Sequence, residues 1–178
     1  MSKRVLCLLV DGFEEIETVT PIDLLRRAGV EVVLAALVHR QVKGRCAVTL
    51  LADDLLENVD PSAFDALFIP GGPGVGEMRE DERAAALAKA FAGQGKTVAA
   101  ICAAPLVLKD AGLLEGKRFT AHFSVHEDLP GVIDERVVTD GNLMTSRGAG
   151  TALDFGLALV ERLAGAEASE EVRAAIMA

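Results

Sequence analysis

Cys102 stands where an apolar run gives way to a helical pattern. Residues 97–101 predict a buried strand, and residues 103–110 predict a helix. The flanking Ala100 and Ala104 are small enough for a sharp strand-to-helix turn of the kind that presents a nucleophile. At the start of a helix, unpaired N–H groups and the helix dipole favour a thiolate. The pattern predicts a reactive Cys102, although a small buried cysteine that only packs would show the same pattern.

A glycine pair follows another predicted strand, residues 66–69. Here the chain reads Ile-Pro-Gly-Gly-Pro-Gly, with Gly71 and Gly72 at its centre. Glycine lets the backbone approach a ligand closely, and its N–H group can stabilise a developing oxyanion. A plain Pro-Gly turn is the alternative interpretation.

Three acidic residues, Glu14, Glu15 and Glu17, begin the helix that follows the first strand. Carboxylates are favourable at a helix N-terminus, which explains any one of them without catalysis. A carboxyl group buried beside Cys102 would differ, because burial raises its pKa and the neutral acid can donate a hydrogen bond to a thiolate.

The remaining histidines and cysteines carry weaker signals. His122 follows a predicted strand and could orient a substrate or move a proton, whereas His126 and His39 fit surface or structural positions. Cys7 lies within the first predicted strand and is expected in the core. Cys46 lies in a predicted loop and is expected to be a peripheral thiol.

The elements that must position these residues alternate between short apolar runs and amphipathic stretches, which predicts a mainly parallel sheet with helices on both faces. Ligands of such sheets bind beyond the carboxyl ends of the strands. The first helix is expected to have Pro21 near its first turn and Gly29 just past its end. Strands are predicted at 5–10, 30–37, 48–51, 66–69 and 97–101, a hairpin at 136–138 and 143–146, and further helices at 80–92, 103–110, 149–163 and the C-terminus.

Composition narrows the classes of function. A chain of 178 residues that is 51% hydrophobic and 25% charged suits one globular domain, residues 1–178. Its net charge of −9 argues against binding to nucleic acid or an anionic membrane. No run approaches the roughly 20 apolar residues of a membrane span, and none resembles a signal peptide, so a cytoplasmic location is expected. The three cysteines show neither a disulfide framework nor metal-ligand spacing.

Four segments together resemble the ThiJ/PfpI superfamily, within it the branch of the human parkinsonism-associated protein deglycase and its bacterial relatives. They are KRVLCLLVDGFEEIETVTPIDLLRRAG, FIPGG, VAAICAAP and TSRGAGTALDFGLALVERLAG, in that order over most of the chain. The resemblance implies a flavodoxin-like sandwich, a homodimer and no metal or organic cofactor.

The resemblance also implies roles for individual residues. It places the nucleophile on Cys102, the acid that hydrogen-bonds the sulfur on Glu17, and a nearby histidine on His122. Residues implied for oxyanion or substrate binding, pocket lining or dimer contact are Gly71, Gly72, Ala103, Glu14 and Arg147.

The implied activity is a glutathione-independent glyoxalase or deglycase that acts on a small aldehyde or dicarbonyl such as methylglyoxal. One alternative is a non-enzymatic oxidative-stress sensor or holdase chaperone that works through oxidation of Cys102. A peptidase or amidase is a third alternative. It is weaker because the protease-like branch has a histidine directly after the cysteine, where this chain has Ala103. The stretch FSVHEDLPG, which follows His122, departs from the deglycase pattern, so the resemblance does not define the substrate pocket.

Overall fold

A seven-stranded sheet forms the centre of the computed structural model, which describes residues 2–178. The strand order is β5-β2-β1-β6-β7-β9-β8, and every neighbouring pair is parallel except β8 with β9. This confirms the predicted α/β sandwich with a mainly parallel sheet. The strands are β1 (Arg4–Leu9), β2 (Glu31–Ala36), β5 (Asp54–Leu55), β6 (Ala66–Ile69), β7 (Thr97–Ile101), β8 (Val137–Asp140) and β9 (Leu143–Ser146).

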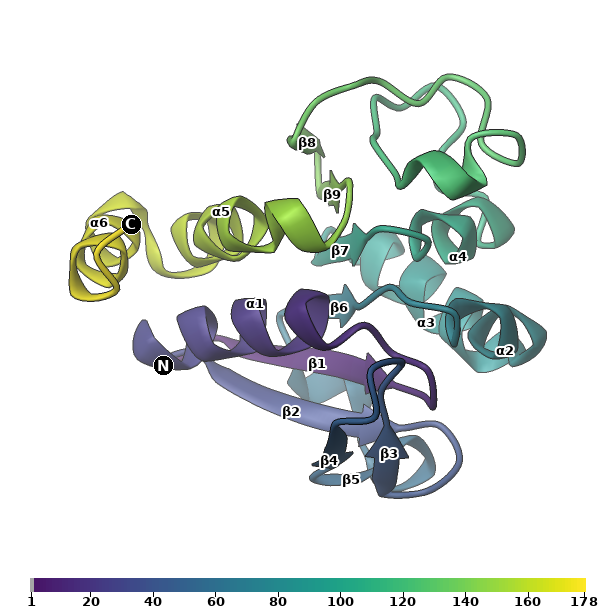
Figure 1. The fold of residues 1–178 in the computed structure, drawn as a ribbon, viewed down its shortest axis with the longest axis horizontal. Coiled ribbons are helices and arrows are strands. Elements are labelled where there is room, and N and C mark those ends of the chain that lie inside the picture. The colour runs from purple at the N-terminus through teal and green to yellow at the C-terminus, as the bar shows by residue number, and fades with distance from the viewer. Residues whose placement is uncertain (1) are drawn as a thin grey trace.

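Helices cover both faces of this sheet (Figure 1). One layer consists of α1 (Glu15–Arg27), α5 (Ala152–Ala164) and α6 (Ala166–Ala175), and the other of α2 (Val75–Glu80), α3 (Glu82–Gly93) and α4 (Pro105–Asp110). Short 3-10 turns occur at Leu56–Asn58, Pro61–Ala63, Phe123–Val125 and Ala149–Thr151. No helix among residues 2–178 is long and apolar enough to cross a membrane.

Strand β1 shows why the sequence patterns of the central strands are continuously apolar. Successive side chains of a strand point to opposite faces, and here both faces are covered. Leu6 and Leu8 pack into the core beneath α2, α3 and α4, while Val5, Cys7 and Leu9 pack into the core beneath α1 and α5. The expected core position of Cys7 is confirmed, and burial raises the pKa of its thiol.

Pro21 lies farther inside helix α1 than expected. It was expected near the first turn, but the helix starts at Glu15, as the three glutamates predicted, and Pro21 lies in its interior. The start has a local cause, because Glu14 caps the helix and its Oε2 accepts a hydrogen bond of 2.7 Å from the backbone N–H of Glu17. Proline lacks an N–H group, so the carbonyl of Glu17, four residues before it, loses its helical partner.

The strand expected at 48–51 does not join the main sheet. It forms β4 (Thr49–Leu51), which pairs with β3 (Gln41–Lys43) in a separate antiparallel hairpin. The hairpin is tied to the rest of the fold, since the N–H of Lys43 donates to Asp11 at 2.8 Å and Oε1 of Glu15 accepts hydrogen bonds from the turn. It is thereby held close to the N-terminus of α1.

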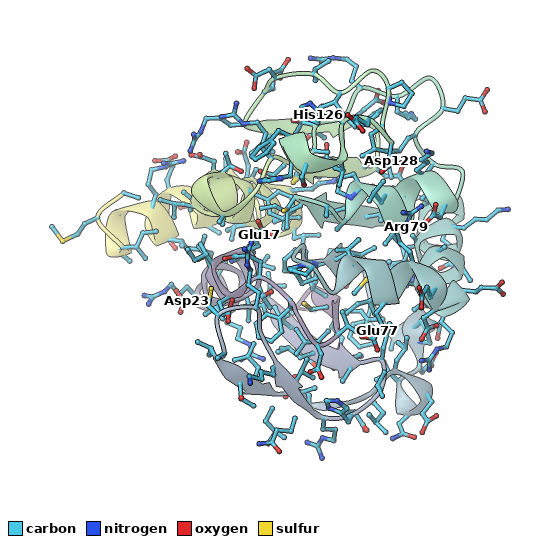
Figure 2. All side chains as sticks on the ribbon, turned by 45° about the vertical axis from the view of Figure 1, so that its right-hand side comes forward. Glu17, Asp23, Glu77, Arg79, His126 and Asp128 are labelled. Atoms are coloured by element: carbon cyan, nitrogen blue, oxygen red, sulfur yellow. The ribbon has the colours of Figure 1, made fainter. Side chains whose placement is uncertain are left out.

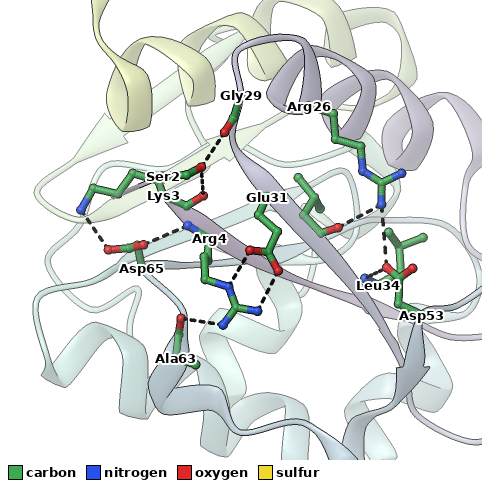
Figure 3. Close-up of polar contacts among 11 residues, drawn as sticks. Ser2, Lys3, Arg4, Arg26, Gly29, Glu31, Leu34, Asp53, Ala63 and Asp65 are labelled. Atoms are coloured by element: carbon green, nitrogen blue, oxygen red, sulfur yellow. Dashed lines mark hydrogen bonds and ion pairs between the residues drawn. The ribbon is translucent and has the colours of Figure 1, made fainter.

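Ion pairs join the elements at the amino-terminal end of β1 (Figure 3). Lys3 Nζ lies 2.9 Å from an oxygen of Asp65, and Arg4 binds Glu31 through two hydrogen bonds of 2.9 and 2.7 Å. These pairs are partly exposed, so each contributes little to stability. They connect β1 with β2 and with the segment before β6, at the end of the sheet opposite Cys102.

Candidate active site

Cys102 occupies the predicted turn directly after β7. Its φ of +67° lies in the left-handed region, which L-residues rarely adopt and which costs on the order of 1–3 kcal/mol. Two hydrogen bonds hold this conformation: the Cys102 N–H donates to the carbonyl of Ser146, and its carbonyl accepts from the N–H of His122, both at 2.9 Å. The side chain is 9% exposed, so the sulfur is largely shielded from water.

The expectation that a helix N-terminus makes this thiol acidic is wrong. Helix α4 starts only at Pro105 and has six residues. Burial, followed by the charge and hydrogen bond of Glu17, raises the pKa of the Cys102 thiol to about 12. The backbone amides of Gly72 and Ala103 face the sulfur and lower its pKa, but the other influences outweigh them.

Glu17 lies in the first turn of α1 with 2% of its surface exposed. Figure 2 shows it in the interior of the molecule, whereas Asp23 on the same helix lies at the side. Burial raises the pKa of the Glu17 carboxyl to about 7; the Cys102 hydrogen bond lowers it, the charge of Glu14 raises it, and the amides of Ala149 and Gly71 lower it. Oε2 of Glu17 is buried and has no hydrogen-bond partner in the part of the chain that the structure describes.

Glu17 and Cys102 therefore form a coupled pair of acids. Two adjacent buried acids resist holding two negative charges, so the pair loses one proton near pH 7 and above that pH carries one charge and one proton. When the proton is on Glu17, the carboxylate charge that raises the thiol pKa is gone, and the neutral carboxyl can donate to the sulfur. In that protonation state Cys102 is a thiolate beside a neutral Glu17.

Glycines allow this pair to form. A Cβ atom at Gly71 would collide with Oε2 of Glu17, with Cβ of Cys102 and with the carbonyl of Ile101. Gly71 also accepts a 3.0 Å hydrogen bond from the N–H of Glu14. The amide of Gly71 faces Glu17, whereas the amides of Gly72 and Ala103 face the sulfur, so only the latter two lie where an oxyanion formed at Cys102 could meet them.

His122 reaches the site from a different local structure than predicted. No strand precedes it, since residues 117–122 are irregular. Nδ1 accepts a hydrogen bond of 3.3 Å from the N–H of Ser124, and it lies 2.8 Å from Oγ of that serine. Burial, then the charges of His126 and Arg45, lower the pKa of His122. In the resulting neutral ring Nδ1 is an acceptor, so the proton is on Nε2 and His122 serves as a donor.

Gly148, which the sequence did not single out, completes the contact between these side chains. A Cβ atom there would lie 3.2 Å from Cδ2 of His122, 3.4 Å from Oε1 of Glu17 and 4.0 Å from the Cys102 sulfur. The absence of a side chain at Gly148 therefore keeps open the space that the acid, histidine and thiol all face.

A cavity of about 340 Å³ opens above Cys102. It is lined by Glu14, Glu17, Arg45, Gly72, Pro73, Val75, Gly76, Arg79, Cys102, Ala103, Leu106, His122, Ser124 and Ala149. Arg147 is not among these residues; its guanidinium pairs with Asp134 instead, so the structure does not support its expected place in the pocket lining. Arg45 and Arg79 were not anticipated there.

A larger open groove, about 660 Å³, lies at the opposite end of the sheet and includes Lys3, Asp65 and Lys96. It contains no cysteine or histidine, so we place the candidate active site in the smaller cavity. Within residues 2–178, no group of three or more His, Cys, Asp or Glu side chains is placed to hold a metal ion.

The profile of the DJ-1/PfpI family matches residues 3–162. The chain belongs to the DJ-1/PfpI family. Protein dj-1beta of Drosophila melanogaster is 42% identical over 97% of this chain and 95% of its own length. A deglycase of Thermococcus kodakarensis is 36% identical over 83% of this chain and 91% of its own length. Among solved DJ-1/PfpI structures, oxidized Toxoplasma gondii DJ-1 superposes with a TM-score of 0.93 at 34% identity, covering 99% of this chain and 98% of that one.

Proposed function

We propose that the protein is a cysteine-dependent, glutathione-independent glyoxalase and deglycase acting on methylglyoxal-type dicarbonyls. The observation that carries this proposal is the pairing of Cys102 with a buried carboxyl whose pKa is raised to about 7. An acid with that pKa can both give and take a proton near neutral pH. Deglycase relatives in the same family, such as the Thermococcus protein, support the same class of activity.

The first step forms a covalent bond between enzyme and substrate. The Cys102 thiolate attacks the aldehyde carbon, the S–C bond forms, and the carbonyl electron pair moves to oxygen. The amides of Gly72 and Ala103 and the Nε2–H of His122 are the donors available to that oxygen. The neutral Glu17 supplies the proton that gives the hemithioacetal, and it becomes the carboxylate.

The second step transfers a proton between the two carbons of the substrate. The Glu17 carboxylate removes the proton from the former aldehyde carbon, which gives an enediol, and returns it to the neighbouring carbon. The hydroxyl proton on the first carbon's oxygen moves to the oxygen of the second carbon. The first carbon is thereby oxidised and the second reduced, which leaves a thioester on Cys102. Water hydrolyses the thioester, so methylglyoxal yields lactate and glyoxal yields glycolate, with no external oxidant or reductant.

Lactate formation from methylglyoxal by the purified protein tests this mechanism. We expect turnover by the wild type, loss of turnover in Cys102→Ser, and a strong reduction in Glu17→Gln. Cys46→Ser is the matched control, because this exposed thiol lies outside the cavity lining. Turnover that survives Cys102→Ala at the wild-type rate contradicts the mechanism.

We also propose that the protein is a cytoplasmic homodimer. Large apolar side chains are exposed on α1 and on the neighbouring hairpin: Ile16 is 53% exposed and Leu51 is 69% exposed. Exposed apolar patches mark interaction surfaces in soluble proteins. Light scattering at two concentrations tests the dimer, with Ile16→Glu expected to weaken it. The three free thiols fit a reducing compartment.

Oxidative-stress sensing, with or without holdase activity, is the second candidate. The relative from Toxoplasma gondii was solved in an oxidized form, and a neutral Glu17 could donate a hydrogen bond to an oxidised Cys102. Intact-mass analysis after mild peroxide tests the idea, and oxidation at Cys46 with none at Cys102 contradicts it. The peptidase alternative has less support, because Ala103 supplies no histidine beside the cysteine.

A further inference from the structure

Arg45 is a cation of the cavity that the proposed reaction does not use. Within residues 2–178, every other arginine side chain has a hydrogen bond or an ion pair, whereas the guanidinium of Arg45 has neither. It nevertheless lines the cavity above Cys102 and lies near enough to His122 to lower the pKa of that ring. A guanidinium presents a fork of N–H donors that matches a carboxylate or a phosphate.

The backbone around Arg45 is fixed even though its side chain is free. The N–H of Arg45 donates to the carbonyl of Phe13 at 2.9 Å, and the N–H of Cys46 donates to Glu15 at 2.7 Å. The turn between β3 and β4 is thus attached to the segment that leads into α1. This attachment holds the position from which the guanidinium projects, so a bound anion would not have to order the loop.

The other charges of the cavity are already engaged. Arg79 on α2 forms two hydrogen bonds with Asp110, at 2.6 and 3.0 Å, which neutralise it. Figure 2 shows Arg79 and Glu17 as separate positions within the fold. Glu14 is 7% exposed and its Oε2 caps α1. An anionic ligand would therefore find one uncommitted partner, Arg45, in a protein whose net charge is −9.

The size of the cavity agrees with a substrate longer than methylglyoxal. Pockets of roughly 300–1,000 Å³ enclose drug-sized ligands, and this cavity of about 340 Å³ exceeds the needs of a three-carbon dicarbonyl. We propose that Arg45 binds the carboxylate or phosphate of an anionic 2-oxoaldehyde while Cys102 attacks its aldehyde carbon. This inference rests on the proposed function and names its substrate class.

The anionic group takes no part in the bond changes. For 4,5-dioxopentanoate, the S–C bond forms at the aldehyde carbon, the proton shifts to the neighbouring carbon, and water releases 2-hydroxyglutarate. One water is consumed, and the oxidation of one carbon balances the reduction of the other. The distal carboxylate remains unchanged and serves only for binding.

The test compares 4,5-dioxopentanoate with its neutral methyl ester. In Arg45→Gln we expect kcat/KM to fall about 10- to 100-fold for the anion, the effect of losing a charge-assisted hydrogen bond, and less than about threefold for the ester. Arg40→Gln is the matched control, since Arg40 donates to the carbonyl of Ala52 and does not line the cavity. A third substrate, 2-oxo-3-phosphooxypropanal, carries a phosphate in place of the carboxylate. The loss of kcat/KM for it in Arg45→Gln shows whether binding of a phosphate depends on Arg45 more than binding of a carboxylate does.

Equal losses for anion and ester in Arg45→Gln, or no loss for either, overturn the inference and leave the glyoxalase proposal standing. Equal losses with a change of oligomeric state would show that Arg45 acts at a subunit contact. If wild type turns over neither substrate, the glyoxalase proposal fails, and calorimetric binding of 2-hydroxyglutarate to Cys102→Ser decides the inference separately. Weaker binding in Cys102→Ser/Arg45→Gln supports the anion site, and unchanged binding overturns it.

Discussion

Replacing Glu17 with glutamine should change how stability depends on pH. Burial raises the pKa of the Glu17 carboxyl from 4.5 to about 7 in the folded protein. This rise in pKa makes the charged carboxylate about 3 kcal/mol less favourable, relative to the neutral acid, in the folded protein than in the unfolded chain. The folded state holds this proton more tightly than the unfolded state does. The contribution of Glu17 is therefore fully present below pH 4.5 and is lost as the pH rises through 7.

Glutamine has nearly the same shape and cannot ionise, so Glu17→Gln escapes this loss. Between pH 5 and pH 8 we expect the free energy of unfolding of the variant to rise relative to wild type by about 2.5 kcal/mol. Urea unfolding of both reduced proteins, at one protein concentration and several pH values, measures the difference. The exposed Glu167→Gln on α6 is the control and should run parallel to wild type.

The same experiment in a Cys102→Ala background isolates the cause. Burial is the largest influence on the Glu17 pKa, so the pH-dependent difference should persist without the thiol. A difference between wild type and Glu17→Gln that stays constant within about 0.5 kcal/mol from pH 5 to 8 would refute the raised pKa and the coupled pair built on it.

Three further outcomes are expected. The kcat/KM for methylglyoxal should rise with pH through a midpoint near pH 7, because the pair must lose one of its two protons, and this step should vanish from the residual activity of Glu17→Gln. Gly71→Ala should lose at least about 1–3 kcal/mol of stability and most activity, because its Cβ collides with Glu17 and Cys102, whereas Gly93→Ala, with open space around it, should keep both. Peptide mapping after brief iodoacetamide treatment should find Cys46 alkylated well before Cys102, and the reverse order would contradict their relative exposure.

The main architecture was accessible from sequence because it depends on local patterns. Continuous apolar runs predicted the central strands, and small residues on both sides of Cys102 predicted its turn. The partner acid was not derivable in the same way. Glu17 is one of three neighbouring glutamates, and only the resemblance to a family chose among them, since its burial depends on packing against Gly71.

The predictions that the structure contradicts failed because they depend on contacts between residues far apart in the sequence. The segment before His122 is bonded through a side chain, with the N–H of Thr120 donating to Oγ1 of Thr145 at 2.9 Å, and it forms no strand ladder. Strand β3 has three residues, too few for a pattern, so the sequence did not reveal that its hairpin brings Arg45 to the cavity. The thiol pKa was misjudged because burial and a neighbouring charge exceed the effect of a short helix.

The side chain of Glu15 joins the β3–β4 hairpin to the start of helix α1. Oε1 of Glu15 accepts hydrogen bonds from the N–H groups of Cys46 and Val48, at 2.7 and 3.3 Å. It thereby links the turn that carries Arg45 to the helical turn that carries Glu17. The positions of Arg45 and Glu17 therefore depend on one shared contact, and replacing the hairpin with one of another length is expected to move both.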